Sequence, residues 1–492
     1  MTRFRTLTAT LVAATALAGC TVGPNFERPA APGASAYASP HDALPKPAPG
    51  PGAALGAGPS LAWWKAFNSP AMDALVDRAI AHNASLEASN ATLAAAREQV
   101  AAARGHELPQ VDVNAGAHHE EANLAGFGFK LGALPGLTSN PVFDLYSVGG
   151  GISYDLDLFG KQRGKVEQAA AQAEAQQRQT EAAHLALAGQ VVNQVLTIAA
   201  IRERIATSNA LLADDQRNVD LTQKRKQAGE GTLTEVLNAQ AQFMADRSTI
   251  PQLEQQLDEA RHLLATLIGI APADLGPTDF DLDAFTLPQQ IPVTLPSALV
   301  HKRPDILQAE ADLHAATAAV GIATADLYPD VTLGGTYTQG SPTIGDLLSS
   351  KFRGFDLFAG LTAPIFHGGT LKAQKRAAID QAKAADATYR QTVLDAFRQT
   401  ADLLDAIKSD ARSVANREES VGVAQHSLQL SRRSFQVGNS GLLQILDSQR
   451  LYEQARMGLV DMREQQFVNV ARLYVATAGG WTGPAIETAS AQ

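Results

Sequence analysis

The spacing of proline constrains this chain more than any other feature of its sequence. No proline occurs between residues 142 and 250, or between residues 365 and 483. Both stretches are rich in Ala, Gln, Leu, Arg and Glu, which favour the helix that proline would break. Each stretch therefore predicts helices much longer than those of ordinary globular domains.

A coiled-coil pattern runs through the second of these stretches. Its seam positions recur at steps of three and four residues: Ala382, Ala385, Tyr389, Val393, Phe397, Thr400, Leu404, Ile407, Ala411 and Val414. A continuous helix from Gly368 to Gln436 would be on the order of 100 Å long. We expect it to pack against further helices, as in a closed helical tube, and a solitary solvated coiled coil is the alternative.

The chain also contains an internal duplication. Three pairs of segments match in the same order, at offsets of 209, 207 and 220 residues: Lys226–Gln240 with Phe435–Gln449, Leu158–Gly160 with Ile365–His367, and Leu108–Val113 with Tyr328–Leu333. Each half is expected to contain a helix, two extended segments, a long helix, a turn marked by glycine and one returning helix.

Four segments alternate apolar and polar residues with a period of two. They lie at about residues 109–119, 143–158, 329–339 and 354–366. Such segments of about ten residues are typical of transmembrane strands with an apolar outer face. Four strands cannot enclose water, so two chains would give an eight-stranded tube and three chains a twelve-stranded one. A soluble sheet that caps the coiled coil is the alternative.

The N-terminus has the features of a bacterial lipoprotein signal. Arg3 and Arg5 precede an apolar run at residues 7–17, and a small-residue cleavage site follows, ending at Cys20. Because Cys20 is the only cysteine, disulfides and thiolate metal sites are excluded, and its expected role is lipid attachment. An ordinary buried cysteine is the alternative. We identify no later apolar run of about 18 residues and expect no transmembrane helix.

Charge and motifs argue against several other function classes. The formal net charge of −10 disfavours a nucleic-acid partner. The sequence lacks the motifs of serine hydrolases, phosphate-binding loops and zinc proteases, so no catalytic residue or cofactor is predicted. His118–Glu121 is better explained as a solvated strand end than as a metal site, and no metal is expected. Trp63 and Trp64 are expected to anchor packing.

Three features together resemble the TolC/OprM-type outer-membrane factors, specifically the lipoprotein branch that serves resistance-nodulation-division (RND) pumps. They are Cys20–Pro29, the doubled motif of a glycine turn followed by Leu-Asn-Ala-Gln or Leu-Asp-Ser-Gln, and Ala471–Trp481. The resemblance covers almost the whole mature chain. It implies a mainly α fold with a membrane β-barrel, in which a homotrimer forms a twelve-stranded barrel and an α-helical barrel of long coiled-coil helices.

The resemblance implies the function of a passive exit duct in a tripartite RND-type efflux system for drugs or other small toxic compounds. The implied partners are two further copies of the chain, a periplasmic adaptor protein, an inner-membrane RND transporter and outer-membrane lipid. The implied location is the outer membrane, with a lipid anchor on Cys20 and an extension into the periplasm. A type I secretion exit channel and a non-conducting structural lipoprotein are the alternatives, and an envelope enzyme ranks below them.

The resemblance also assigns a gate and a docking surface. In the family the glycine turns lie at the periplasmic tip, which assigns adaptor docking to Gly229, Gly231, Leu233, Gly438, Gly441 and Leu442. By motif match, Leu443 and Asp447 take the positions that narrow the pore. Three copies of Asp447 would form an anionic ring, with Asn238 at the equivalent position of the first half. A solvated acid early in a helix is the alternative for Asp447.

The resulting domain organisation has six parts. They are a signal peptide at 1–19, a lipidated tether at 20–60, a first repeat at 61–270, an equatorial linker at 271–295, a second repeat at 296–481 and a C-terminal tail at 482–492. Nine of the 24 prolines lie in the tether, which favours an extended segment after the lipid.

Overall fold

The computed structural model describes residues 21–30, 33, 36, 37, 52–56, 58–123 and 140–477. The predicted signal peptide, Cys20, much of the tether and the C-terminal tail lie outside the described residues. The chain divides into two compact units, each with segments from both predicted repeats. Unit 1 comprises the described parts of Met1–Arg28, Ala94–Glu174 and Ala311–Ala387, and unit 2 those of Pro29–Leu93, Ala175–Glu310 and Thr388–Gln492.

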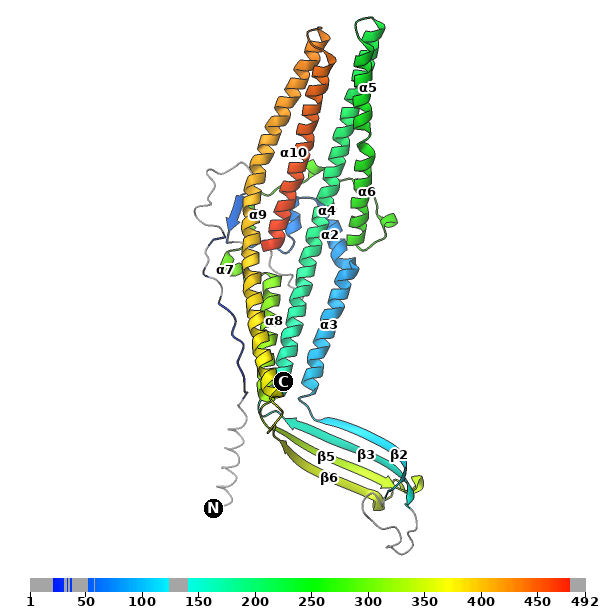
Figure 1. Ribbon diagram of the computed structural model, residues 1–492, viewed down its shortest axis with the longest axis vertical. Coiled ribbons are helices and arrows are strands. Elements are labelled where there is room, and N and C mark those ends of the chain that lie inside the picture. Colours follow the sequence, from blue (N-terminus) through cyan, green and yellow to red (C-terminus); the bar gives the residue numbers. More distant parts are fainter. Residues whose placement is uncertain are drawn as a thin grey trace. The chain divides into compact units, whose positions relative to one another are not determined.

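A four-stranded antiparallel sheet dominates unit 1 (Figure 1). Its strands, in spatial order, are β2 (Gln110–Glu121), β3 (Val142–Leu156), β5 (Asp330–Ser341) and β6 (Arg353–Thr362). They lie where the period-two alternation predicted strands, although β6 ends at Thr362 rather than near residue 366. Two short 3-10 helices, η6 (Ile344–Asp346) and η7 (Ser350–Phe352), connect β5 to β6.

The pleat of this sheet sorts its side chains into an apolar and a mainly polar face. Val111 is paired with Ile152, and Tyr337 with Phe355, so these side chains share one face. The apolar face is exposed to a large extent, most of all at Val111, Val113, Phe355, Leu357 and Leu361. The opposite face carries Asp112, Asn114, Asp155, Thr332, Thr336, Thr338 and Asp356.

Unit 1 also holds the residues that directly follow Cys20. The Val22 N–H donates to the Phe159 carbonyl at 3.1 Å, just after β3. The Phe26 ring stacks on His314 with 4.4 Å between ring centroids, and His314 is 2.8 Å from the Glu167 carboxylate. These contacts involve α4 (Lys161–Gln227) and α8 (Pro304–Ala325). Parts of α3 (Ala84–Gly105) and α9 (Thr370–Gln436) complete the unit.

Two helices of 67 residues each, α4 and α9, supply the long segments of unit 2. α9 is followed by one returning helix, α10 (Leu442–Thr477), whereas α4 is followed by two, α5 (Leu233–Arg247) and α6 (Ile250–Leu267) (Figure 1). The expectation of a single returning helix is therefore wrong for the first half. The break lies just before Pro251, which a helix accepts only in its first turn.

The main hydrophobic core of unit 2 forms where α4, α6 and α10 meet η2 (Trp63–Phe67) and α2 (Pro70–His82). Trp63 stacks on Tyr474 with 5.5 Å between ring centroids, and Trp64 is also buried. The two tryptophans therefore anchor packing rather than present a ligand surface.

α4 contains an apolar stretch that the sequence analysis did not expect after the signal peptide. Among the described helices it contains a stretch long and apolar enough to cross a bilayer by length and composition, with a mean hydropathy of 1.4. However, 61% of that stretch is buried, and side chains of α4 such as Val191, Val195 and Ile198 lie in the main core. The apolar stretch is thus explained by packing inside unit 2.

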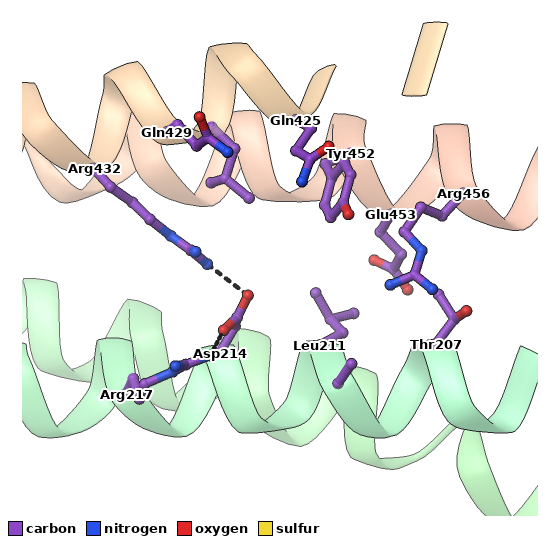
Figure 2. Close-up of a pocket in the computed structure, with 12 residues that line it drawn as sticks. Thr207, Leu211, Asp214, Arg217, Gln425, Gln429, Arg432, Tyr452, Glu453 and Arg456 are labelled. Atoms are coloured by element: carbon purple, nitrogen blue, oxygen red, sulfur yellow. Dashed lines mark hydrogen bonds and ion pairs between the residues drawn. The ribbon is translucent and has the colours of Figure 1, made fainter. Parts of the chain in front are cut away.

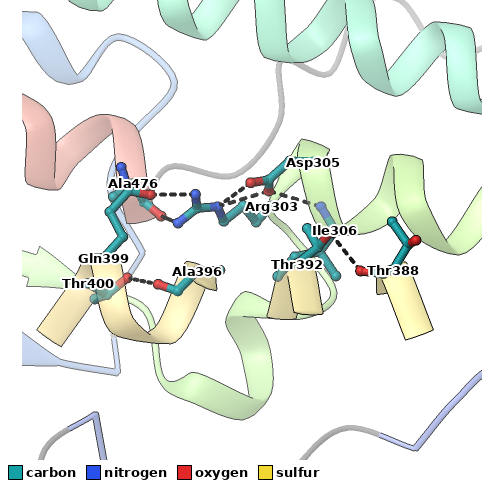
Figure 3. Close-up of polar contacts among 9 residues, drawn as sticks. All are labelled: Arg303, Asp305, Ile306, Thr388, Thr392, Ala396, Gln399, Thr400 and Ala476. Carbon is teal, nitrogen blue, oxygen red and sulfur yellow. Dashed lines mark hydrogen bonds and ion pairs between the residues drawn. The ribbon is translucent and has the colours of Figure 1, made fainter. Parts of the chain in front are cut away.

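Short elements of unit 2 connect α6 to α8. They are η4 (Pro272–Asp274), η5 (Leu282–Ala284), β4 (Gln290–Val293) and α7 (Pro296–Leu299), and β4 pairs in parallel with β1 (Gly52–Leu55). Arg303 follows α7 and joins three elements (Figure 3). Its guanidinium donates to Asp305 at 2.9 Å, to Gln399 of α9 at 2.6 Å and to the Ala476 carbonyl of α10 at 3.3 Å.

Candidate functional site

The two glycine turns of unit 2 have the same backbone geometry. Gly229 and Gly438 both have positive φ, 79° and 77°, which only glycine adopts without strain. In the first turn, the Gly229 N–H donates to Lys226 and the Glu230 N–H to Arg225. In the second turn, the bonds run from Gly438 to Phe435 and from Asn439 to Ser434. Both turns thus end a long helix with the same capping motif, at the offset of 209 residues.

The helices that leave the turns begin differently. Thr232 caps α5 and forms a reciprocal pair with Glu235, whereas α10 begins after Gly441 without a side-chain cap of this kind. The corresponding leucines differ in exposure, since Leu233 is 54% exposed and Leu442 only 2%. Leu442 packs with Val219, Ala239 and Phe435, so its side chain is buried inside unit 2, and its assignment to the docking surface stays a prediction.

Leu443 and Asp447 lie on the side of α10 that faces α5. Together with Asn238, they line an open groove whose other residues are Ala241, Gln242, Gln444, Leu446 and Arg450. Leu443 is 68% exposed, and Asp447 accepts a hydrogen bond from Arg450 at 3.0 Å. The anionic charge expected at Asp447 is therefore partly balanced within the same helix.

Figure 2 shows a polar cavity further along α10, where α10 faces α4 and α9. The cavity has a volume of about 290 Å³ and is lined by residues of α4, α9 and α10: Thr207, Ala210, Leu211, Asp214, Arg217, Gln425, Leu428, Gln429, Arg432, Tyr452, Glu453 and Arg456. Arg432 of α9 donates to Asp214 of α4 at 2.6 Å, and Arg217 bonds to the same carboxylate. This ion pair joins the two long helices.

A chain of buried polar groups joins α4 to α10 beside this cavity. Gln449 donates to Asp215 at 2.6 Å, and Asn218 donates to Gln449 at 2.8 Å. Ser431 of α9 and Ser448 of α10 share a further hydrogen bond of 2.7 Å. Buried polar groups must be paired, so these contacts fix how the helices align.

The acids of this region bind protons more tightly than usual. Burial, the hydrogen bond with Asp246 and the Asp246 charge together raise the pKa of Asp215 to about 8, against a weaker lowering by Gln449. Burial and the charge of Asp246 raise the pKa of Glu453 to about 7. Neither acid could be identified from the sequence, because Asp215 lies in the polar run Asp214–Asn218 and its partner Gln449 is 234 residues away.

The weak metal candidate at His118–Glu121 lies on β2 in unit 1. His119 is 2.8 Å from Asp144 of β3. Within the described part of the chain, no group of three or more metal-ligating side chains comes together. A single His–Asp contact is not a metal site.

Residues 75–270 and 295–479 match the family described as outer membrane efflux protein. The pyoverdine export outer membrane protein OpmQ of Pseudomonas aeruginosa is 31% identical over 419 residues, covering 85% of this chain and 87% of that protein. The probable efflux pump outer membrane protein TtgC of Pseudomonas putida is 29% identical over 497 residues, covering 99% of both.

Solved structures share the fold. The open state of the Neisseria gonorrhoeae MtrE outer membrane channel matches with a TM-score of 0.77 at 26% identity, covering 94% of this chain and 98% of that chain. The similarity therefore includes the sheet and the long helices of both units.

Proposed function

This chain belongs to the outer membrane efflux protein family, and from that membership we propose that it is the exit duct of a tripartite RND-type pump, with no catalytic site of its own. The predicted family, the mainly α fold with a β domain and the role as an outer-membrane component of efflux are confirmed. The assembly, the partners, the gate and the lipid anchor are the proposed parts.

The proposal rests mainly on the open, four-stranded sheet of unit 1. Among the described residues, β2 and β6 are edge strands, and the apolar face between them is exposed. An exposed apolar face and unpaired edges are unfavourable in water and favourable in a closed barrel within lipid. Three copies would supply twelve strands, with the polar face toward the lumen.

Exposed apolar side chains of unit 2 support association of the helices as well. Val423 and Leu430 of α9 and Val437, directly after α9, recur every seven residues and are all exposed. Leu237 and Met244 of α5 are also seven residues apart and exposed. A seven-residue apolar repeat is the signature of a helix that packs along another helix. We assign these stripes to contacts between neighbouring copies in a homotrimer.

The gate is assigned to Leu443 and Asp447. They are four residues apart and line one groove, so they lie one above the other on the same side of α10. In a threefold assembly each would become a ring, apolar at Leu443 and charged at Asp447. The bond with Arg450 lowers the repulsion between three carboxylates and so favours a closed arrangement.

Adaptor docking is assigned to the glycine turns, with the backbone and the small residues as the contact surface. Added Cβ atoms at Gly229, Gly438 and Gly441 would meet nothing within 4 Å, so all three positions are open to a partner. Leu233 is exposed beside them, whereas the buried Leu442 supports the turn from inside.

The lipid anchor is assigned to Cys20, which lies outside the described residues. Its successors Thr21 and Val22 pack at Gly160 and Phe159, directly after β3. The acyl chains on Cys20 would therefore be attached close to the end of β3, where they could insert into a leaflet of the outer membrane. No other cofactor is proposed.

Conductance in planar lipid bilayers tests the channel proposal. The purified mature protein should insert and give discrete single-channel steps, with no pump or adaptor present. Protein that is protected from protease in liposomes, and so is inserted, but passes no current would support the non-conducting structural alternative instead.

A further inference from the structure

We propose that Asp215 of α4 and Asp246 of α5 share one bound proton, and that this proton-binding site fastens α4 to α5 and α10. The site lies within unit 2 and does not depend on the proposed channel role. Its evidence is a buried acid with an oxygen that receives no hydrogen bond from a donor, a second carboxyl group that faces this acid, and a cavity lined by the neighbouring Asp214.

The carboxyl group of Asp215 is shielded from water. The residue is 1% exposed, and one of its oxygens accepts from Gln449 of α10 at 2.6 Å. The other oxygen is buried, and no N–H or O–H donor of the protein bonds to it. An ionised carboxylate is strongly unfavourable here, because burial removes the water around its charge and no donor replaces that water at one of its oxygens.

The group that faces Asp215 makes the ionised form still less favourable. Asp246 lies within hydrogen-bonding reach, and it already accepts from Gln242 on its own helix at 2.7 Å. Two ionised carboxylates can only accept, so they would repel each other. One proton resolves this conflict, because protonated Asp215 donates to Asp246 while its other oxygen keeps the bond from Gln449.

The other charged groups around the site do not replace the proton. Glu453 of α10 adds further negative charge near both acids. On α9, the guanidinium of Arg432 is bonded to Asp214 instead. Arg456 of α10 lines the cavity with Glu453, and its guanidinium lies 5.9 Å from the centroid of the Tyr452 ring.

The cavity in Figure 2 is lined by Glu453, the acid whose charge acts on both Asp215 and Asp246. Glu453 lines this space of about 290 Å³, which is large enough for water, and it interacts electrostatically with Asp246. Glu453 can thus relay a proton between cavity water and the buried pair.

The pH range follows from the direction of the pKa shift. The pKa of Asp215 is raised to about 8, so the folded state holds the proton more tightly than the unfolded chain does. The stabilising contribution is therefore complete below the unfolded pKa of about 4 and is lost as the pH rises through about 8. In the neutral range the site is occupied and α4, α5 and α10 stay joined.

Infrared spectroscopy of the detergent-solubilised full-length mature protein tests the proposal. We would use a Glu453→Gln background, so that this second acid does not titrate in the same range. The C=O stretch of a protonated carboxylic acid should persist at neutral pH and disappear with a midpoint near pH 8. Asp246→Asn should move that midpoint to lower pH by about one unit or more, because it removes the facing charge.

Asp215→Asn should abolish the band and keep the hydrogen bonds, since an amide is the neutral isostere of the protonated acid. Its apparent Tm should stay constant between about pH 6 and pH 9, where that of the parent falls. Asp220→Asn, at an exposed position of the same helix, should behave like the parent. A band lost already below pH 6, or a midpoint unaffected by Asp246→Asn, would overturn the proposal even if the Asp215 variant did not fold.

Discussion

Asp214 and Asp215 are adjacent on α4, yet their carboxyl groups bond to two different helices. Asp214 binds Arg432 of α9 through an ion pair, and Asp215 accepts from Gln449 of α10. Consecutive side chains of a helix point about 100° apart around its axis, so two adjacent residues of α4 can reach two different neighbouring helices. The position along α4 at which α9 and α10 are joined is thereby fixed.

A double-mutant cycle on Asp214→Asn and Arg432→Met should give a coupling energy of about 0.5–1 kcal/mol, because the pair is only partly shielded from water. Chemical unfolding of the four proteins measures it. Arg217 binds the same carboxylate but is 73% exposed, so the cycle with Arg217→Met should give a smaller coupling. Equal couplings would mean that the contact between α4 and α9 contributes nothing specific.

Glu453→Gln should stabilise the protein at alkaline pH. The pKa of Glu453 is raised to about 7, so its favourable contribution is complete below about pH 4.5 and lost as the pH rises through 7. Gln stays neutral, and the variant should therefore exceed the parent by about 1–2 kcal/mol at pH 8 and match it near pH 5. Apparent Tm at the two pH values measures the difference. A gain of the same size at both would show that burial of charge is not the cause.

The double variant Leu443→Ala and Asp447→Ala should conduct better at rest. Loss of both rings widens the constriction, and Arg450 then faces the pore without its partner, which reduces cation preference. Single-channel recordings and the entry of a bulky antibiotic such as vancomycin measure the effect. Leu394→Ala, at an exposed position of α9 outside the proposed contact stripe, is the control. Unchanged conductance, selectivity and drug entry in a folded double variant would place the gate elsewhere.

Gly441→Glu should impair export without lowering the amount of trimer. An added side chain there meets no neighbour within 4 Å, and the residue lacks the positive φ that would make replacements at Gly229 and Gly438 strained. Drug susceptibility and crosslinked trimer in membranes give the two readouts. Gly276→Glu, at an equally open position, should export normally. Normal export with all three turn glycines replaced would remove the turns from the docking interface.

Cys20→Ser should abolish acylation while the chain still folds. Mass spectrometry of the mature N-terminus should find acyl groups on the parent and none on the variant. The parent should be a trimer by light scattering in detergent. An unmodified parent N-terminus, or a stable monomer, would contradict the anchor or the assembly.

Local patterns predicted most of the secondary structure because they depend on neighbouring residues. The alternation at about 329–339 is β5, and the helix expected from Gly368 begins at Thr370. The break between α5 and α6 was also marked locally, by Pro251, but the long proline-free stretch before it favoured continuity.

Properties that depend on tertiary contacts could not be predicted in this way. Leu233 and Leu442 occupy matching positions in the two sequence halves, but only Leu442 meets Val219 and Phe435, so only one is buried. Likewise, Arg450 as the partner of Asp447 changes the charge at the candidate gate, although the motif match identifies Asp447 alone.

The interruption between α5 and α6 makes the two returning segments mechanically unequal. α10 is one continuous helix from Leu442, next to the second turn, to Thr477, close to Tyr474. Because its backbone hydrogen bonds are uninterrupted, a displacement of the turn would be transmitted along α10 to the stack of Tyr474 on Trp63. On the other side, the same push can be absorbed as bending at Ser248 and Thr249, where the ladder is interrupted. A force on the second turn would therefore displace residues of the hydrophobic core, whereas a force on the first turn would mainly bend the chain between α5 and α6.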